Sequence, residues 1–337
     1  MERRNFLKSV TAAGLAASTS ALGQGTSPAR TAARAQHPEM MYRQLGRTGE
    51  LVSAIGLGGG HIGSQATPEE SIHLIRTAMD RGITFLDNCW DYNGGLSEVR
   101  MGWALRDGYR SKAFLMTKMD GRTADVYNKQ LEQSLGRLQT EMIDLVQFHE
   151  IIRMEDPDRI FAKGGAIEAA VAAREAGKIR YIGFTGHKDP AVHLRMLEMA
   201  QQHGFHFDTV QMPVNVMDAH FRSFARQVLP VANQQGIGVL AMKTLGGGNI
   251  LKSGTVEASE AIRYALSQPV SVVIAGMDSM PILEQALEVA RTFKPLTTVE
   301  TASLLERTRK AAADGSFEIF KTSVDFDGTA KNPEWLG

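Results

Sequence analysis

Residues 83–105 read ITFLDNCWDYNGGLSEVRMGWAL, and this stretch changes character twice. It begins as the apolar run Ile83–Leu86, turns polar at Asp87, and enters a pattern of helical period at Ser97 after a pair of glycines. This order predicts a strand, a loop and a helix. A carboxylate therefore stands at the end of the predicted strand, and the phenol of Tyr92 follows it by five residues.

The same succession recurs along the chain. Apolar runs end at residues 57, 86, 117, 148, 184, 212, 242 and 275, with spacings of 28 to 36 residues. The runs are apolar throughout rather than alternating, which is typical of a parallel sheet that is buried on both faces. The predicted strands are Ala54–Leu57, Thr84–Leu86, Phe114–Thr117, Leu145–Phe148, Tyr181–Phe184, Thr209–Met212, Val239–Met242 and Val272–Ala275.

The intervals between these strands hold segments of helical period. In Pro68–Met79 the apolar residues recur at helical spacing, and Thr67 stands at the N-cap position. Further helices are predicted at Ala166–Ala176, Ala191–Gln202, Phe221–Gln235, Val256–Leu266 and Leu283–Thr292. Eight strand–helix units predict an α/β fold of the (β/α)8 barrel type. An open doubly wound sheet would need a G-x-G-x-x-G motif after its first strand, and Gly58-Gly59-Gly60 lacks that spacing.

The two ends of the barrel region carry smaller elements. Short extended pieces around Gly46 and Gly49 predict an N-terminal β-hairpin, and Glu300–Ala313 predicts one further helix. The tail at 315–337 has little periodicity and is predicted to be a lid or strap. We therefore expect a single domain over residues 36–337, with the barrel core at 52–294 and the C-terminal helix and tail at 295–337.

The composition is that of a globular protein with an ample core. Hydrophobic residues make up 43% of the chain and charged residues 22%, and the 37 basic residues balance the 37 acidic ones. A net charge of zero gives no reason to expect nucleic acid or an anionic membrane as a partner. The single cysteine, Cys89, excludes an internal disulfide and any iron–sulfur cluster or zinc site built on cysteines, and we expect no metal. No apolar run long enough to span a membrane follows the N-terminal segment.

The first 35 residues resemble a targeting segment. The paired arginines Arg3-Arg4 precede the weakly apolar run Val10–Leu22, as in a twin-arginine export signal. An Ala-x-Ala pattern at Ala33–Ala35 would leave Gln36 as the mature end. We expect the twin-arginine export machinery as a partner and a periplasmic location, or a cytoplasmic one if the signal is not processed. The alternative is a disordered basic tail.

Polar side chains end three neighbouring strands, with Asp87 after the second, Lys118 after the third and His149 after the fourth. In a barrel these ends converge on the face that carries the active site. Asp87 would hold the ammonium of Lys118, which would lower the pKa of the Tyr92 phenol from its ordinary value of about 10. Tyr92 would then donate a proton to a carbonyl group, and hydride would come from a nicotinamide cofactor. His149 would either orient that carbonyl group or help to relay the proton.

Residues 41–291 resemble the aldo-keto reductases. DNCWDYNGGLSE at 87–98 is similar to the D-(x)4-Y-G-x-S-E segment of that family, MTK at 116–118 to its lysine strand, and DLVQFH at 144–149 to its D-L-x-Q-x-H strand. The resemblance implies a catalytic tetrad of Asp87, Tyr92, Lys118 and His149, with Tyr92 as the general acid. It also implies that NAD(P)H binds across the barrel mouth.

The resemblance further implies the cofactor contacts, with departures. Thr185 keeps the hydroxyl of a family serine at the nicotinamide carboxamide, whereas Gly186 lacks the amide of the asparagine beside it. Met242 replaces an aromatic residue that stacks on nicotinamide, and Lys243 is expected to reach the pyrophosphate. The implied cofactor residues are Gly59, Thr185, Gly186, Gln211, Met242, Lys243, Leu245, Gly247, Gly276, Asp278 and Ser279, and Trp90 is the expected substrate contact.

The sequence does not decide between NAD and NADP as the cofactor. The family prefers NADP, but Asp278 stands in the adenosine-phosphate segment, where an acidic group would repel a 2′-phosphate. We expect a monomeric oxidoreductase that interconverts an aldehyde or ketone, with sugars among the candidates, and an alcohol. Two alternatives are a nicotinamide-binding redox-sensing module with negligible turnover and a sugar-converting enzyme that retains and recycles NAD(H).

Overall fold

The computed structural model describes residues 28–337. The paired arginines Arg3-Arg4 and the apolar run Val10–Leu22 lie outside these residues, and the export signal stays a prediction. Among the residues described, no helix is both long enough and apolar enough to cross a membrane.

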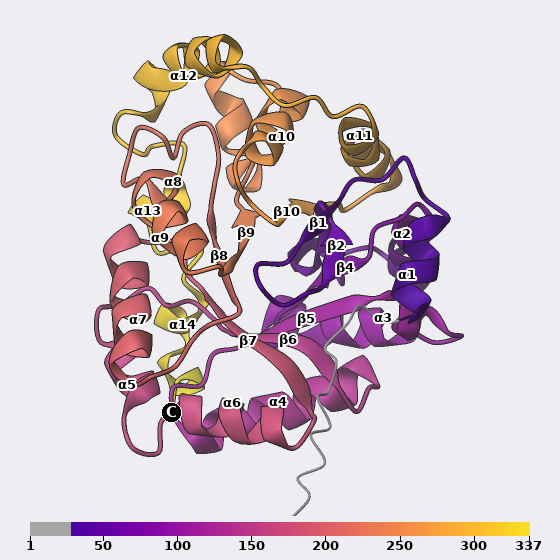
Figure 1. Cartoon of the computed structure of the whole chain (residues 1–337), viewed down its shortest axis with the longest axis vertical. Helices are drawn as coiled ribbons and strands as arrows, with labels where there is room; N and C mark the ends of the chain where they lie inside the picture. The colour runs from indigo at the N-terminus through magenta and orange to yellow at the C-terminus, as the bar shows by residue number, and fades with distance from the viewer. Residues whose placement is uncertain (1–27) are drawn as a thin grey trace, which may run out of the picture.

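Eight parallel strands close into a barrel in the order β10-β3-β4-β5-β6-β7-β8-β9 (Figure 1). The strands are β3 (Ile55–Gly58), β4 (Phe85–Asp87), β5 (Phe114–Met119), β6 (Ile143–Phe148), β7 (Ile179–Thr185), β8 (Thr209–Pro213), β9 (Gly238–Met242) and β10 (Val272–Gly276). Each begins and ends within two residues of its predicted run. The prediction of a (β/α)8 barrel is confirmed.

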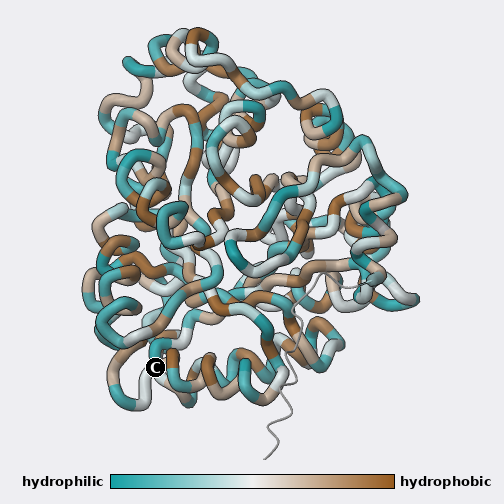
Figure 2. The backbone as a smooth tube through the Cα atoms, in the orientation of Figure 1, coloured by the Kyte–Doolittle hydropathy of each residue, from teal (hydrophilic) through white to brown (hydrophobic). Residues whose placement is uncertain are grey.

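Helices alternate with the strands and surround the barrel (Figure 1). α2 (Pro68–Asp80) begins at a capping box between Thr67 and Glu70, as its N-cap residue predicted. The other helices are α1 (Pro28–Ala35), α3 (Leu96–Ala104), α4 (Ala124–Leu138), α5 (Asp156–Phe161), α6 (Ala166–Glu175), α7 (Pro190–Gln202), α8 (Phe224–Gln227), α9 (Leu229–Gln234), α10 (Ala258–Ser267), α11 (Met280–Arg291), α12 (Thr298–Ala312), α13 (Ile319–Thr322) and α14 (Gly328–Lys331). Figure 2 shows hydrophobic and hydrophilic residues side by side along these helices, as expected where one helix face packs on strands.

One predicted helix, Phe221–Gln235, is divided into α8 and α9. Asp218 accepts the backbone N–H groups of Phe224 and Ala225, so the helix starts later than predicted. Pro230 lies in the first turn of α9 and lacks the N–H that a continuous helix would need at this point. The prediction was wrong here because a periodic pattern does not report this break.

The predicted hairpin contributes to the barrel core. β1 (Tyr42–Gln44) and β2 (Leu51–Ser53) pair antiparallel. Leu45 and Val52 are fully buried and belong to the same apolar cluster as Phe85 of β4. The hairpin therefore packs into the fold and is not a separate appendage.

Helix α1 lies within the segment that the sequence assigned to a signal or disordered region, residues 1–35. Arg30 of this helix is buried, and its guanidinium contacts two buried carboxylates, Asp144 at 2.9 Å and Glu50 at 3.3 Å. The folded body therefore includes residues before the predicted boundary at Gln36. Cleavage after Ala35 would remove Arg30 from this charge cluster.

The C-terminal tail, residues 315–337, lies over the loops that follow β4, β6 and β8. It contains α13, α14 and a short turn at Pro333–Trp335 instead of one long element. Its contacts run from Trp335 to Trp90, from Thr329 to Glu150 and from Lys321 to Asp218. The tail thus covers part of the barrel mouth.

We predict that Arg30→Ala lowers the free energy of unfolding by about 2 kcal/mol, because two buried carboxylates lose one of their cations. The loss stays below that of an isolated buried pair because Arg110 and Arg180 still bind Asp144. Urea titration measures the change. Arg34→Ala in the same helix is the matched control, since Arg34 makes no ion pair among the described residues. Equal stability of the Arg30→Ala protein and the wild type would contradict the prediction.

Candidate active site

Asp87, Lys118 and Tyr92 meet at the mouth of the barrel. Asp87 ends β4 and Lys118 lies near the end of β5, and both side chains are buried. The Lys118 ammonium forms an ion pair with Asp87 and donates a hydrogen bond to the Asn88 carbonyl at 2.6 Å. It also lies 3.3 Å from the Tyr92 hydroxyl. The lysine thus joins a carboxylate to the phenol, as expected from the strand ends.

A sharp turn after β4 presents Tyr92 to the mouth. Asn93, Gly94 and Gly95 follow it with φ values of 54°, 64° and 89°, all in the left-handed region. Glycine adopts this conformation at little cost. A side chain at Gly95 would in addition collide with the guanidinium of Arg137. The two glycines therefore allow the chain to pass directly from Tyr92 into α3.

The pKa of the Tyr92 phenol lies well above its ordinary value. Burial is the main cause, and the charge of Asp87 adds to it. The lowering expected from Lys118 is not found, because Asp87 balances the charge of that ammonium at closer range. At neutral pH the phenol is therefore protonated, which is the form that donates a proton.

His149 follows β6 directly and faces the same space as Tyr92. Its Nδ1 lies 2.8 Å from Oδ1 of Asp120 and 3.2 Å from Sγ of Cys89, which leaves Nε2 for a ligand. Burial lowers the pKa of His149, but the charges of Asp120 and Asp91 outweigh it, and the net shift is upward. The ring is biased toward imidazolium, which can donate a hydrogen bond to a carbonyl oxygen.

Sequence reasoning missed three residues of this site, Asp120, Glu150 and His187. Each follows a strand end by one or two residues, on β5, β6 and β7. The pattern that identified Lys118 and His149, a polar residue at or just after the end of an apolar strand, also identifies these three residues. The tail residues around the site carry no comparable signal.

Cys89, Asp91 and His149 form a spatial trio whose potential ligand atoms lie within 4.8 Å of one another. The sequence could not show it, because Cys89 and His149 are 60 residues apart. Burial raises the pKa of the Cys89 thiol, and the charges of Asp91 and Asp120 raise it further. Because the thiolate is the form that binds metals, this trio favours a hydrogen-bonded cluster over a metal site.

The residues implied for the nicotinamide carboxamide lie beside the tetrad. Gln211 donates from Nε2 to Oδ2 of Asp87 at 2.7 Å, while its Oε1 is buried and has no partner in the described structure. An unmatched buried acceptor costs about 1–3 kcal/mol, so this oxygen favours a ligand that brings an N–H group. Thr185 and Met242 line the cavity at the mouth, with Oγ1 of Thr185 3.9 Å from Sδ of Met242. A carboxamide fits these three residues.

Gly186 cannot carry the side chain that the family places there. The carbonyl of Ile151 and the ring of His193 lie against its Cα, where a Cβ would stand. The departure at this position therefore follows from packing between the loop after β6 and α7.

The remaining implied cofactor residues lie around the rim instead of in the cavity. They are Gly59 after β3, Leu245 and Gly247 after β9, and Gly276, Asp278 and Ser279 at and after the end of β10. β9, β10 and β3 are neighbours in the barrel, so the three loops form one continuous edge. The His61 ring lies against Gly276, and Ser279 donates from its hydroxyl to Asp278 at 3.0 Å.

Three members of the tetrad, Tyr92, Lys118 and His149, face a cavity of about 230 Å³. Its walls come from the barrel and from the tail: Asp91, Tyr92, Lys118, His149, Glu150, Thr185, His187, Met242, Lys243, Asp325, Phe326 and Gly328. Trp90, the expected substrate contact, is not among them. Its indole N–H donates to Gln133 at 2.7 Å, and its ring packs edge-on against Trp335 at 5.4 Å between centroids.

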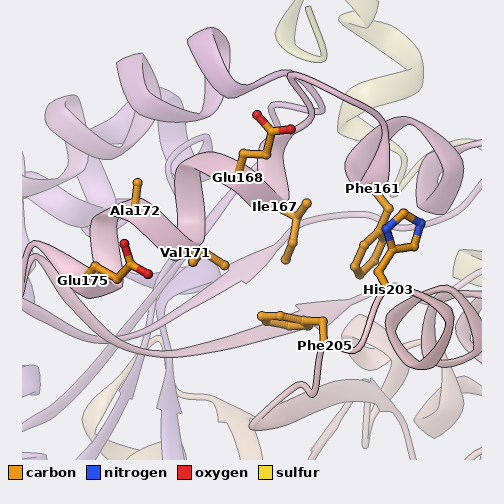
Figure 3. A pocket seen from close by; sticks show the side chains of 8 residues that line it. All are labelled: Phe161, Ile167, Glu168, Val171, Ala172, Glu175, His203 and Phe205. Carbon is orange, nitrogen blue, oxygen red and sulfur yellow. The ribbon is translucent and has the colours of Figure 1, made fainter. Parts of the chain in front are cut away.

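A larger hollow of about 410 Å³ lies on the outside of the barrel (Figure 3). Ile167 and Val171 of α6 form one wall, and Phe161, His203 and Phe205 form the other. No member of the tetrad lines it. The chemistry therefore belongs to the smaller cavity at the mouth.

Residues 54–260, more than half of the chain, match the model of the aldo/keto reductase family, and the chain belongs to that family. Its members are oxidoreductases that act on carbonyl and alcohol groups and use NAD(P)H. The chain is 31% identical over 229 residues to an uncharacterized oxidoreductase, YrpG, of Bacillus subtilis (strain 168), covering 62% of this chain and 68% of that protein.

Two further similarities extend over more of the chain. L-galactose dehydrogenase of Arabidopsis thaliana is 27% identical over 316 residues, covering 78% of this chain and 94% of that protein. An aldo-keto reductase of Bacillus halodurans, solved in its holo form, superposes with a TM-score of 0.68 at 23% identity, covering 83% of this chain and 99% of that chain. The second likeness supports the fold alone.

We predict that Asp120→Asn lowers the pKa of His149, because the charge that favours imidazolium is removed while burial remains. The rate constant kcat/KM for carbonyl reduction then falls about tenfold at neutral pH. An NMR titration of the ring, assigned with His149→Gln, follows the pKa. Asp125→Asn on the exposed side of α4 is the control. An unchanged His149 titration would refute the role of Asp120.

Proposed function

We propose that this protein interconverts a small aldehyde or ketone and the corresponding alcohol, with a nicotinamide dinucleotide as its redox partner. The proposal depends on one observation: the Lys118 ammonium joins Asp87 to the Tyr92 hydroxyl at the wall of the cavity in the barrel mouth. Membership of the aldo/keto reductase family supports it.

The side chains of this site have separate roles. Hydride reaches the carbonyl carbon from the reduced nicotinamide when that group is bound. His149 donates a hydrogen bond from Nε2 to the carbonyl oxygen, and Tyr92 gives its proton to that oxygen as negative charge develops there. Lys118 stabilises the phenolate that remains, and Asp87 keeps the ammonium in place.

The cavity supports a small and polar substrate. The polar side chains of Asp91, Glu150, His187 and Lys243 line it together with Tyr92, Lys118 and His149. Its volume of about 230 Å³ lies below the range of drug-sized pockets. The similarity to L-galactose dehydrogenase makes a sugar one candidate within this class.

We predict that Tyr92→Phe reduces kcat for carbonyl reduction by about a thousandfold, because the proton donor is lost. Binding of NADH and NADPH stays within about threefold of the wild type, since the phenol is not needed to hold the dinucleotide. Steady-state assays on a carbonyl panel and fluorescence titration of both dinucleotides measure the two effects. Tyr109→Phe, whose hydroxyl bonds Asp80 at the surface, is the matched control. Activity of Tyr92→Phe near the wild-type level would overturn the assignment.

We predict different pH profiles for the two directions of the reaction. Reduction needs the protonated phenol, and because burial raises the pKa of Tyr92, this form persists through neutral pH and is lost only above the raised pKa. Oxidation of an alcohol needs the phenolate, so its kcat/KM rises about tenfold per pH unit below that pKa. Assays of both directions between pH 6 and pH 10 test this. A plateau of the oxidation rate below pH 8 would contradict it.

A further inference from the structure

Arg122 lies in the loop that follows β5, and its side chain is fully buried. Its guanidinium donates hydrogen bonds from all three nitrogens. Nε pairs with Asp156 at 2.9 Å, and Nη1 donates to the carbonyl of Asp120 at 2.6 Å. Nη2 donates to the carbonyls of His149 and Glu150 at 2.9 and 2.8 Å. One buried cation therefore contacts both loops that carry the hydrogen bond between Asp120 and His149.

Asp156, the anionic partner of this cation, binds the same loop after β6. It is buried, and its Oδ2 accepts hydrogen bonds from the N–H groups of Ile152 at 3.0 Å and Arg153 at 2.9 Å. Buried backbone groups outside helices and strands need such partners from side chains. The ion pair with Arg122 thus takes up carbonyl groups at the start of the loop and N–H groups further along it. It therefore fixes the backbone of residues 149–153.

The loop needs these contacts because Glu150 has an unfavourable backbone conformation. Its φ of 46° lies in the left-handed region, which residues with a side chain rarely adopt. Such a conformation persists only where the surrounding structure imposes it. Arg122 binds the carbonyl groups on both sides of the Glu150 Cα and so fixes the two dihedral angles between them. Because His149 directly precedes Glu150, the same contacts fix the direction of the imidazole.

The loop after β5 is itself bound independently of the guanidinium. The N–H of Gly121 donates to Oε1 of Gln130 at 2.8 Å, and the N–H of Arg122 donates to the carbonyl of Leu336 at 2.8 Å. The carbonyl of Arg122 accepts from the N–H of Ala166 at 2.9 Å. These bonds come from α4, the tail and α6. A change of the Arg122 side chain therefore alters what the guanidinium binds and leaves the course of its own loop in place.

The protonation of His149 depends on its position because several acids surround the ring. Burial lowers the pKa of His149, and nearby charges, that of Asp120 foremost, raise it, with a net upward shift. Coulomb attraction falls as the distance grows, so this shift requires the 2.8 Å contact between Nδ1 and Asp120. The titratable groups near the ring are Asp120 after β5, Glu150 after β6, and Cys89, Asp91 and Tyr92 after β4.

We propose that Arg122 is a positioning residue of the active site, which fixes Asp120 and His149 relative to each other and so sets the hydrogen bond that His149 donates to the substrate carbonyl. Arg122 is not among the residues that line the cavity, so it acts through these two. The proposal rests on the proposed carbonyl chemistry at Tyr92.

Arg122→Lys tests the proposal because lysine keeps the positive charge near Asp156 but lacks the planar fork that binds three carbonyl groups at once. We expect kcat for carbonyl reduction to fall about thirtyfold, while KM for the dinucleotide stays within about threefold. NMR titration should show a lower pKa for His149 than in the wild type, since burial remains and Asp120 is no longer fixed beside the ring. An unchanged His149 titration overturns the proposal.

Arg110→Lys is the matched control. Arg110 likewise binds one buried carboxylate and two backbone carbonyl groups, those of Asp144, Ala113 and Met142. These contacts lie at the opposite end of the barrel, where β5 and β6 begin. Urea titration should show a loss of stability in both variants, but Arg110→Lys keeps the kcat and the His149 titration of the wild type. Equal losses of kcat in the two variants overturn the proposal.

Asp156→Asn weakens the same ion pair by a milder change and serves where Arg122→Lys does not fold. We expect it to lower the pKa of His149 in the same direction and kcat by about threefold. A folded Asp156→Asn protein with the kcat and the His149 titration of the wild type overturns the proposal.

A double-mutant cycle with Asp120→Asn separates positioning from a general loosening of the fold. If Arg122 acts through Asp120, Arg122→Lys lowers kcat about threefold or less in the Asp120→Asn background. A thirtyfold loss in both backgrounds overturns the proposal. The NMR titration needs no turnover. If the wild type turns over no carbonyl compound but the His149 titration still depends on Arg122, the carbonyl chemistry fails and the positioning of His149 by Arg122 stands.

Discussion

The ion pair between Lys118 and Asp87 is the interaction on which the site depends. Both groups are buried, and each alone would carry a desolvation cost of several kcal/mol. The remaining hydrogen-bonding capacity of the pair is largely taken up, because Asn88 accepts from the ammonium and Gln211 donates to the carboxylate. This arrangement requires β4, β5 and β8 to end at one face, and the closed parallel barrel brings them there. The barrel therefore serves the chemistry by holding two charges out of water.

The same pairing changes the expected acid–base chemistry. A free ammonium beside Tyr92 would lower the pKa of the phenol, but Asp87 is closer to Lys118 than Tyr92 is and balances its charge. The pKa of Tyr92 therefore lies above its ordinary value. The site holds a protonated donor next to a cation that can stabilise the phenolate once the proton has left. Rate enhancement then comes from charge that is already in place when the proton moves, which requires no reorganisation of solvent.

Short sequence patterns predicted the features of the fold that are determined by residues close together in the chain. The eight strands and the tetrad follow from apolar runs and from the polar residues that end them. Contacts between distant segments were not predictable in this way. The burial of Arg30, the bond between Asp120 and His149, and the position of Trp90 against Trp335 each join residues that no short motif relates. The left-handed backbone of Glu150 is also set by tertiary contacts, since Arg122 binds its carbonyl from another loop.

The tail contacts the loops that carry the candidate catalytic residues. Glu150, which binds Gly328 and Thr329, is adjacent to His149 in the chain, and His187, which pairs with Asp327, follows Thr185 by two residues. Trp90, which packs against Trp335, precedes Tyr92 by two residues. The tail therefore contacts the loops that carry Tyr92, His149 and Thr185. Phe326 also flanks Lys243, and it lines the cavity together with Asp325 and Gly328, so the tail forms one wall of the space that the barrel residues face.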